Sequence, residues 1–132
     1  MKKILIVDDI FTNRLLLREI IKKLNLQSIE AQNGKEAIGL LRHEQVDIVF
    51  MDIEMPVMNG LETTRYIREH LPAPKCNVPI VAITAHDPTS FMDSYSSVGF
   101  TQFMSKPYSI QKLEKLISQF EGSTEQQATQ PA

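Results

Sequence analysis

Short apolar runs recur along the chain and predict its strands. Three of them, at residues 4–7, 48–51 and 80–83, are continuous rather than alternating. Continuous runs of this length are typical of strands that are buried on both faces, as in a parallel sheet. Two further segments, 27–31 and 101–105, mix polar with apolar residues, which is typical of edge strands. The pattern therefore predicts five strands, three of them central.

Apolar residues at helical spacing separate these runs and predict five helices. Polar residues at several of the predicted starts can cap the free backbone N–H groups of a first turn. The fourth segment is rich in serine, a mediocre helix former, so we expect it to be the least stable helix. The predicted helices begin near Thr12 and Asn13, after Asn33-Gly34, near Gly60, at Asp87-Pro88 and at Ile110.

Strands and helices thus alternate along the chain, and this order predicts an α/β fold with a parallel sheet and right-handed crossovers. The 132 residues are one domain's worth of sequence. The alternating pattern ends near residue 120, and residues 121–132 show no hydrophobic period. We therefore expect a domain over residues 1–120 and a disordered C-terminal tail over residues 121–132.

Composition and charge narrow the classes of function. The chain has 14 Lys and Arg against 16 Asp and Glu, a formal net charge of −2, which argues against a strongly basic nucleic-acid binder. Its one cysteine, Cys76, excludes an intrachain disulfide and a cysteine-based zinc site. No apolar stretch approaches the ~18 residues that span a membrane. We expect a cytoplasmic protein with a reduced thiol.

Chemically capable side chains follow four of the predicted strands. Asp8 and Asp9 follow the first strand, Asp52 the third, Thr84 the fourth and Lys106 the fifth. The carboxyl ends of parallel strands meet at one edge of the sheet, where open sheets bind ligands. Clustered carboxylates favour a hard cation such as Mg²⁺, and an ammonium with a hydroxyl suits a phosphoryl group. The set predicts a phosphoryl acceptor that forms an aspartyl phosphate.

These motifs together resemble the response-regulator receiver domain of two-component signalling. They are Asp8-Asp9, the segment 51–60 around Asp52, Ile83-Thr84-Ala85 and Lys106-Pro107. The resemblance covers about residues 1–120, and the stretch 9–15 further resembles the receivers of hybrid sensor kinases. It implies a flavodoxin-like (βα)5 fold, a doubly wound parallel sheet with strand order 2-1-3-4-5.

The resemblance also implies a role for each site residue. Asp52 is the expected phosphoacceptor, and Lys106 and Thr84 are expected to hold the transferred group. Asp9 is expected to bind Mg²⁺ directly and Asp8 through a water molecule, with Asp52 and the backbone carbonyl of Glu54 as further ligands. Thr84 and the aromatic residue Phe103, three positions before Lys106, are expected to form the conformational switch.

The expected function is that of a stand-alone phosphoacceptor receiver in a two-component phosphorelay, a signalling switch rather than an enzyme. The expected partners are a sensor histidine kinase or a histidine phosphotransfer domain, together with a downstream protein target. We expect no nucleic acid and no membrane among its partners, and a monomer or a weak dimer.

The first predicted helix is the favoured docking surface for the phosphotransfer partner. It combines apolar residues with a basic stripe, and such a pairing suits a helix bundle with acidic flanks. The alternative is that Ile10 and Leu17 are buried against the sheet and the arginines are merely solvated. The face of the fourth helix, fifth strand and fifth helix is a second candidate, because many relatives use it. The favoured surface comprises Ile10, Phe11, Arg14, Leu15, Leu17, Arg18 and Lys22.

Two other functions compete with the receiver assignment. A phosphatase of the haloacid-dehalogenase type also places an aspartate at a strand end, but it needs a second aspartate two residues later, where this chain has Glu54. It also needs a larger body than 132 residues provide. A pseudo-receiver that only binds partners is the other alternative, and failure to bind Mg²⁺ would favour it.

Overall fold

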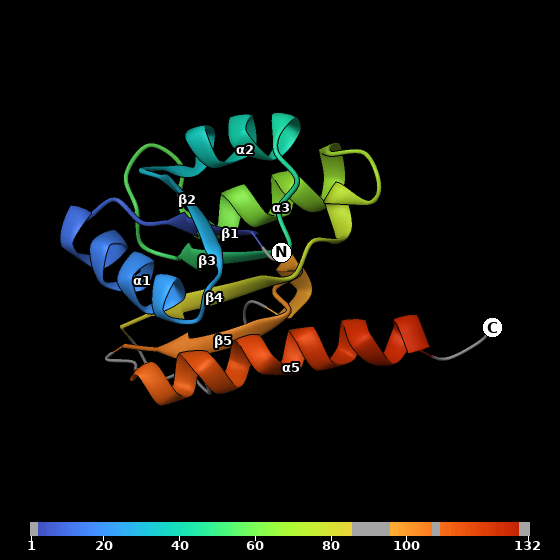
Figure 1. The fold of residues 1–132 in the computed structure, drawn as a ribbon. Helices are drawn as coiled ribbons and strands as arrows, with labels where there is room; N and C mark the ends of the chain where they lie inside the picture. Colours follow the sequence, from blue (N-terminus) through green and yellow to red (C-terminus); the bar gives the residue numbers. More distant parts are fainter. Residues whose placement is uncertain (1–2, 86–95, 107–108, 130–132) are drawn as a thin grey trace.

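A single parallel sheet forms the centre of the molecule. The computed structural model describes residues 3–85, 96–106 and 109–129. The strands lie in the order β2-β1-β3-β4-β5 (Figure 1), as the resemblance implied, and every described pair is parallel. The fold is therefore the doubly wound, flavodoxin-like α/β architecture. The strands are β1 (Lys3–Val7), β2 (Gln27–Ala31), β3 (Ile48–Asp52), β4 (Ile80–Thr84) and β5 (Gln102–Ser105).

Helices cover both faces of this sheet, with α2 and α3 on one face and α1 and α5 on the other (Figure 1). Two short 3₁₀ turns, η1 (Lys75–Asn77) and η2 (Ser96–Val98), precede β4 and β5. The predicted fourth helix at Asp87-Pro88 lies outside the described residues. The described helices are α1 (Phe11–Lys23), α2 (Gly34–His43), α3 (Gly60–His70) and α5 (Ile110–Thr129).

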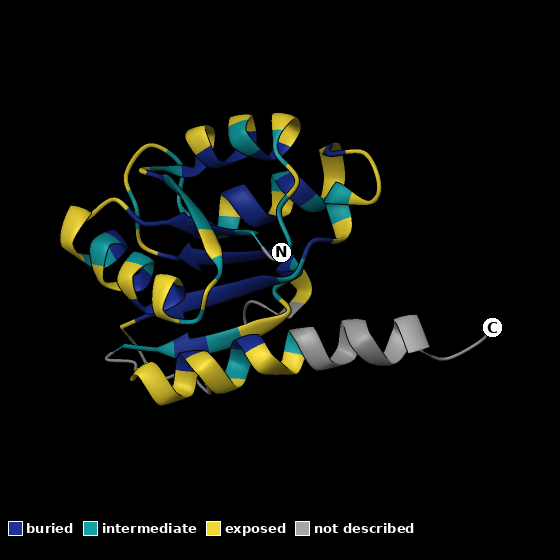
Figure 2. Cartoon of the chain, in the orientation of Figure 1, coloured by how far each residue is buried: buried dark blue, intermediate teal, exposed yellow. Residues whose placement is uncertain are grey.

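The strands separate the core into two layers because successive side chains point to opposite faces. In β1, Ile4 and Ile6 pack with α1 and α5, whereas Leu5 and Val7 pack with α2 and α3. The three central strands are almost wholly buried, and the outward faces of the helices are exposed (Figure 2). The edge strands β2 and β5 are only partly buried. The prediction of buried central strands and mixed edge strands is confirmed.

The starts of the helices agree with the sequence at three of the four described places, including α5 at Ile110. Asn33 caps α2 by accepting from the backbone N–H of Glu36 at 3.0 Å, and Asn59 forms a capping box with Glu62 before α3. The predicted caps Thr12 and Asn13 of the first helix are wrong. Helix α1 begins at Phe11 after an extended Ile10 without a side-chain cap. The Ile10 carbonyl oxygen accepts from the backbone N–H groups of Asn13 and Arg14, so the helix starts before the two predicted caps.

Helix α5 continues past the predicted end of the domain. It runs through Ile110–Thr129, so residues 121–129 are helical where the sequence pattern indicated a tail without regular structure. The segment includes Glu125, Gln126, Gln127 and Ala128, all good helix formers, so intrinsic propensity outweighs the missing hydrophobic period. The division of the chain at residue 120 stays a prediction.

None of the helices within the described residues has the length and apolar character needed to span a membrane.

Candidate functional site

Three carboxylates meet at the carboxyl edge of the sheet. Asp52 is the last residue of β3, and Asp8 directly follows β1. These two strands are neighbours with Val7 opposite Met51, so their ends bring Asp8 and Asp9 beside Asp52. One carboxylate oxygen from each aspartate lies within 4.8 Å of the others. The sequence prediction that these residues gather is confirmed.

The Asp8 side chain is held from several directions. It is 2% exposed, and its Oδ1 accepts from the backbone N–H of Ile10 at 2.9 Å. The Asn13 side-chain amide donates to Asp8 Oδ2 at 3.3 Å. Asp9, by contrast, is exposed. The two adjacent aspartates therefore differ: Asp8 is anchored in the fold, and Asp9 is open to solvent.

The negative charge of Asp52 is destabilised by its surroundings. It is 4% exposed, and its Oδ1 accepts one backbone hydrogen bond, from Glu54 N at 3.2 Å. Burial and the neighbouring Asp8 raise the pKa of Asp52 to about 6, although Lys106 and the Glu54 amide act in the opposite direction. A carboxylate whose charge is destabilised in this way gains from any cation placed beside it.

Lys106, directly after β5, provides such a cation. Its Nζ lies 3.8 Å from Asp8 Oδ2 and 3.9 Å from Asp52 Oδ1, so it bridges the two buried aspartates. Its backbone N–H donates to the carbonyl oxygen of Thr84 at 2.7 Å. This bond continues the β4–β5 pairing, in which Thr84 lies opposite Ser105. The sheet itself therefore positions the ammonium group.

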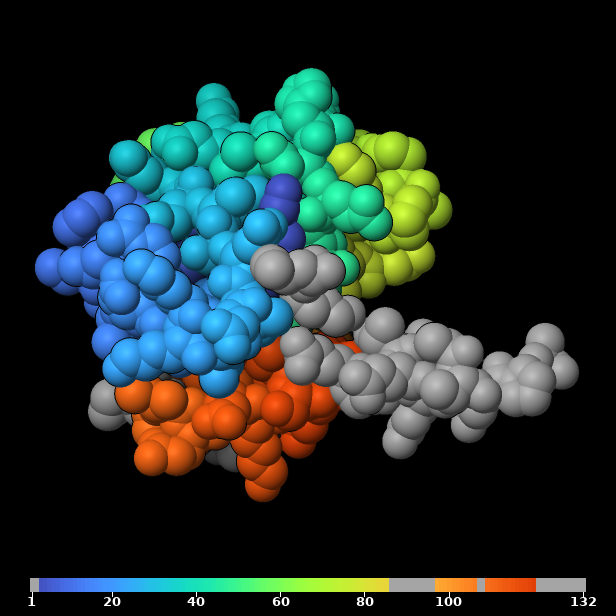
Figure 3. Space-filling view, in the orientation of Figure 1, coloured from blue at the N-terminus to red at the C-terminus, as the bar shows by residue number. Residues whose placement is uncertain are grey.

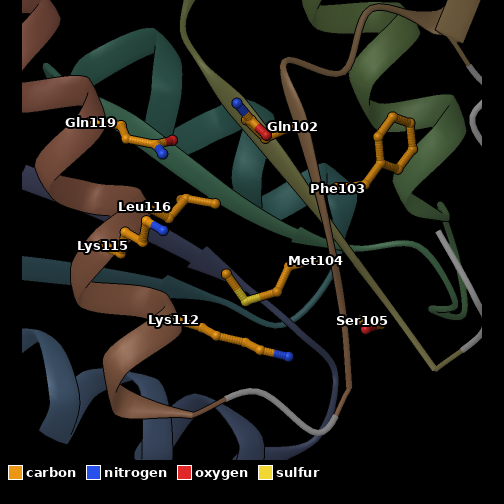
Figure 4. Close-up of a pocket in the computed structure, with 8 residues that line it drawn as sticks. All are labelled: Gln102, Phe103, Met104, Ser105, Lys112, Lys115, Leu116 and Gln119. Atoms are coloured by element: carbon orange, nitrogen blue, oxygen red, sulfur yellow. The ribbon is translucent and has the colours of Figure 1, made fainter. Parts of the chain in front are cut away.

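Thr84 and Phe103 lie on the neighbouring strands β4 and β5. Thr84 ends β4 and is 1% exposed. Phe103 is half-buried on β5 and packs edge-on against Phe100, with ring centroids 5.5 Å apart. Figure 4 shows that Phe103 projects to the side of β5 opposite Met104, which points toward α5. Phe103 is thus free of the α5 packing that holds the other side of its strand.

The groove between β5 and α5 is separate from the carboxylates. It encloses about 360 Å³ and lies on the second predicted docking face (Figure 4). None of the three aspartates is among its lining residues, which are Gln102, Phe103, Met104, Ser105, Lys112, Lys115, Leu116 and Gln119.

The donor set of the cluster fits a hard divalent cation. Three carboxylates supply oxygen ligands within a few ångströms of one another, and Mg²⁺ prefers a small number of carboxylates completed by water and phosphate oxygens. The pKa of Asp52 is raised first by burial and then by the neighbouring Asp8, and Lys106 only partly offsets these effects, so a cation beside this carboxylate is favoured. Asp8, Asp9 and Asp52 are the residues that could hold the ion.

Sequence reasoning missed the support beneath this site. Arg14 is buried, and its Nη1 donates to the backbone carbonyl oxygen of Asp8 at 2.7 Å. Its Nε pairs with Glu30 Oε1 of β2 at 3.1 Å, and Arg18 pairs with the other oxygen of Glu30 at 3.2 Å. Arg14 lies on the same helical face as the buried Leu17 and Ile21. This spacing was the sequence signal that Arg14 is buried.

This arrangement corrects the predicted docking surface on the first helix. Arg14 and Leu17 are buried and cannot meet a partner. Ile10 and Phe11 are 49% and 59% exposed. The alternative prediction, in which Ile10 is buried against the sheet, is therefore wrong for this residue. Lys22 is exposed as predicted. The predicted surface therefore keeps the start of α1, directly after the aspartate pair, and Lys22 near the end of the helix.

Gly60 lets the loop after Asp52 close tightly. A Cβ atom at this position would lie 2.4 Å from the backbone oxygen of Asp52 and 2.8 Å from the Cα of Ile53. Gly60 N also donates to the Ile53 carbonyl oxygen at 3.0 Å. A larger residue would push the start of α3 away from the end of β3.

Comparison with known proteins identifies the family. Residues 4–118 match the response regulator receiver domain, and the chain therefore belongs to this family. It is a receiver domain of two-component signalling, which acts as a signalling switch. Family membership decides against the phosphatase alternative.

The similar proteins include both hybrid kinases and single-domain regulators. The chain is 37% identical over 120 residues to hybrid signal transduction histidine kinase G of Dictyostelium discoideum, covering 89% of this chain. It spans only 4% of that kinase and 6% of the related kinase A. It is 29% identical over 121 residues to the polar-differentiation response regulator DivK of Brucella anthropi, covering 92% of this chain and 97% of DivK.

Solved structures agree with the fold. Chemotaxis protein CheY4 of Vibrio cholerae has a TM-score of 0.83 and 25% identity, covering 91% of this chain and 98% of CheY4. The receiver domain of a sensor histidine kinase from Pseudomonas aeruginosa has a TM-score of 0.82 and 24% identity, covering 92% and 98% of the two chains. That receiver was crystallised with a magnesium ion coordinated in its active-site cleft.

Proposed function

We propose that this receiver domain accepts a phosphoryl group on Asp52 from a phosphohistidine in a two-component phosphorelay. The observation that carries the proposal is the placement of Asp52, buried at a strand end within a carboxylate cluster and 3.9 Å from the Lys106 ammonium. A nucleophilic carboxylate beside fixed positive charge is the arrangement that phosphoryl transfer requires.

In the proposed reaction, an Asp52 carboxylate oxygen attacks the phosphorus in line with the bond to the histidine nitrogen. The new O–P bond forms as the N–P bond breaks, and the imidazole leaves with the electron pair and takes a proton from solvent. The Glu54 N–H already donates to Asp52 Oδ1 at 3.2 Å, which restrains the carboxylate. Lys106 then pairs with a phosphoryl oxygen, and the Thr84 hydroxyl donates to another.

The proposal includes Mg²⁺ as the cofactor, bound by Asp8, Asp9, Asp52 and the Glu54 backbone carbonyl. When bound, Mg²⁺ supplies positive charge that offsets the charge of the transferring phosphoryl group. Support comes from the three clustered carboxylates of this chain and from the magnesium ion in the receiver of Pseudomonas aeruginosa. Exposed Asp9 is the direct ligand in this proposal, because the Asp8 oxygens already accept bonds from Ile10 and Asn13.

We infer that Thr84 and Phe103 convert phosphorylation into a change of surface. A phosphoryl group on Asp52 offers the Thr84 hydroxyl a new acceptor. Movement of Thr84 then frees space for the Phe103 ring, which biases a two-state surface. The buried position of Thr84 at the end of β4 and the half-buried position of Phe103 on the edge strand support this sequence of events.

The proposed partners are a sensor histidine kinase or a histidine phosphotransfer domain, followed by a downstream protein target. Exposed Ile10 and Phe11 at the start of α1 adjoin the aspartate pair and suit docking of the phosphohistidine partner. The proposal assigns the domain to the cytoplasm, without nucleic-acid or membrane partners, as a monomer or weak dimer. It acts as a switch and has no substrate beyond its own phosphoryl group.

Intact-mass measurement with a small phosphodonor tests this function. With acetyl phosphate and Mg²⁺, the wild type gains the mass of one phosphoryl group, and Asp52→Asn gains none because an amide is not a nucleophile. Asp47→Asn is a control at a carboxylate outside the cluster. A mass gain that persists in Asp52→Asn would refute the assignment. Absence of both phosphorylation and Mg²⁺ binding in the wild type would support the pseudo-receiver alternative.

A further inference from the structure

A groove between α2 and α3 lies away from the phosphoacceptor cluster. The two helices are neighbours on one face of the sheet (Figure 1), and α2 forms the edge of the molecule opposite α5 in Figure 3. The groove encloses about 380 Å³, the size of a small binding pocket. Its lining residues are Lys35, Ile38, Gly39, Arg42, Met58 and Tyr66.

One face of α2 supplies most of the groove. Residues 35, 38, 39 and 42 follow the i, i+3, i+4, i+7 spacing of a single helical stripe. Ile38 forms an apolar floor together with Met58 from the loop before α3. Gly39 leaves a gap in that floor, because a Cβ atom built there meets nothing within 4 Å. The centre of the groove is therefore apolar and has room for a side chain from outside.

Both ends of this stripe carry positive charge. Lys35 and Arg42 are separated by seven residues, which is about 10 Å along a helix. Neither makes an ion pair with any residue that the structure describes. Arg42 Nη2 donates to the Tyr66 hydroxyl at 2.6 Å, and its guanidinium lies 5.8 Å from the ring centroid. Tyr66 thus holds Arg42 in place and leaves other guanidinium donors available.

The acidic residues of the first turns of α2 and α3 do not line the groove. No acidic residue lines the groove. Glu36 on α2 accepts from the backbone N–H of Gln32 at 3.3 Å, and Glu62 on α3 accepts from that of Asn59 at 3.2 Å. Both carboxylates are therefore used at helix starts. The groove remains positive at its ends and apolar at its centre.

We propose that the α2–α3 groove binds an acidic segment of a partner protein. The segment places an apolar side chain over Ile38 and Met58 in the space beside Gly39. Its carboxylates, about 10 Å apart, meet Lys35 and Arg42. Apolar contact then supplies most of the affinity, and the two cations select an acidic partner and orient it. This binding does not depend on phosphorylation of Asp52, so it can fail while the proposed function stands.

A pair of designed peptides tests the groove. The probe is an alanine-based helical peptide of about 15 residues with two glutamates two turns apart and leucines between them, and its partner carries glutamines instead. Fluorescence anisotropy on the full chain is expected to give binding of the acidic peptide about tenfold tighter than binding of the glutamine peptide. Equal binding of the two peptides, or no binding of the acidic one, would overturn the proposal.

Variants of the receiver locate the binding site. Gly39→Glu places a carboxylate between the two cations and is expected to weaken binding at least tenfold. Gly39→Ala, which fits the open space and favours the helix, is expected to leave it within about twofold. Lys35→Gln and Arg42→Gln are each expected to weaken binding two- to fivefold, a range of about the size of one exposed ion pair. Lys22→Gln on α1 makes the same charge change and is expected to have no effect.

The pattern across these variants decides the outcome. If Gly39→Glu binds as tightly as Gly39→Ala, or if Lys22→Gln weakens binding as much as Lys35→Gln, the acidic peptide binds elsewhere and the proposal is wrong. Binding of a single-stranded oligonucleotide that Gly39→Glu abolishes, without binding of the acidic peptide, would likewise replace the protein partner with a nucleic acid.

Discussion

The guanidinium of Arg14 donates a hydrogen bond of 2.7 Å from Nη1 to the backbone carbonyl oxygen of Asp8. The arginine is 7% exposed and also pairs with Glu30. It therefore links β2, the start of α1 and the turn that presents the aspartate pair. Because the carbonyl belongs to the residue directly before Asp9, this bond restrains the turn from which Asp9 reaches the proposed metal.

Removal of the buried Arg14 side chain should destabilise the domain. Arg14→Ala leaves Glu30 with only the more exposed Arg18 as a partner, and we expect a loss of about 2–4 kcal/mol of unfolding free energy. Urea denaturation measures this loss. Arg18→Ala is the matched control, because Arg18 contacts the same glutamate from a side chain that is 43% exposed, and it should cost less than about 1 kcal/mol. Equal losses would contradict the structural role assigned to Arg14.

The metal-free domain should lose stability as the pH rises through the Asp52 titration. The pKa of Asp52 in the folded state, about 6, lies above the ordinary value of 3.8. The folded state therefore holds more protons than the unfolded state between these values, and stability falls from about pH 4 to about pH 6 and then levels off. The full effect is at most about 3 kcal/mol.

Asp52→Asn should remove this dependence. In EDTA at neutral pH the variant should be more stable than the wild type, and the two should converge below pH 4, where Asp52 is protonated in both states. The amide oxygen can still accept from Glu54 N, so the comparison isolates the charge. Parallel stability curves for the two proteins across this pH range would show that the burial of Asp52 has no energetic consequence.

Mg²⁺ should raise the melting temperature by binding the folded state. At ten times its Kd the linkage is worth about 1.4 kcal/mol, or roughly 5 °C for a domain of this size. Asp9→Ala should reduce the response more than Asp8→Ala if Asp9 is the direct ligand. The double alanine variant should lose the response, and removal of the repulsion should stabilise its metal-free form. An unchanged Mg²⁺ response in the double variant would place the ion elsewhere.

Val57 occupies a strained backbone conformation in the loop after Asp52. Its φ is +72°, and Met58 N donates to the Pro56 carbonyl oxygen at 2.8 Å across it, which defines a γ-turn of the rare positive-φ type. The side chain is 72% exposed, so it contributes little packing. Val57→Gly should therefore stabilise the domain by about 1 kcal/mol, as measured by urea denaturation. Val57→Ala retains the Cβ atom and should gain less; a loss in Val57→Gly would contradict the strain.

Phe11 should matter for protein donors and not for small ones. Its ring is 59% exposed at the start of α1, so Phe11→Ala should slow phosphoryl transfer from a histidine phosphotransfer domain about tenfold, because the apolar contact is lost. The rate with acetyl phosphate should not change. Lys22→Glu, which reverses an exposed charge on the same helix, should slow phosphoryl transfer from the protein donor mainly at low salt. An equal effect on both donors would mean that Phe11 supports the site and not the docking.

The sequence by itself determined the elements and the chemistry. Continuous apolar runs located the three central strands because both of their faces are buried, and position in the chain alone placed Asp8, Asp9 and Asp52 at strand ends. The rule that parallel strands share a carboxyl edge then brought these residues together. The strand order followed from resemblance to a family, since periodicity does not say which strands are neighbours.

Only the tertiary structure decided which polar groups support the site. The sequence predicted Arg14 on an exposed basic stripe with Arg18 and Lys22, but the side chain is buried and pairs with Glu30 on β2. Asn13, predicted as a cap, lies within α1, and its amide donates to Asp8 on the turn before the helix. Periodicity reports which face of an element is apolar, whereas the partner of a charged or amide group depends on a position in space that the local pattern does not contain.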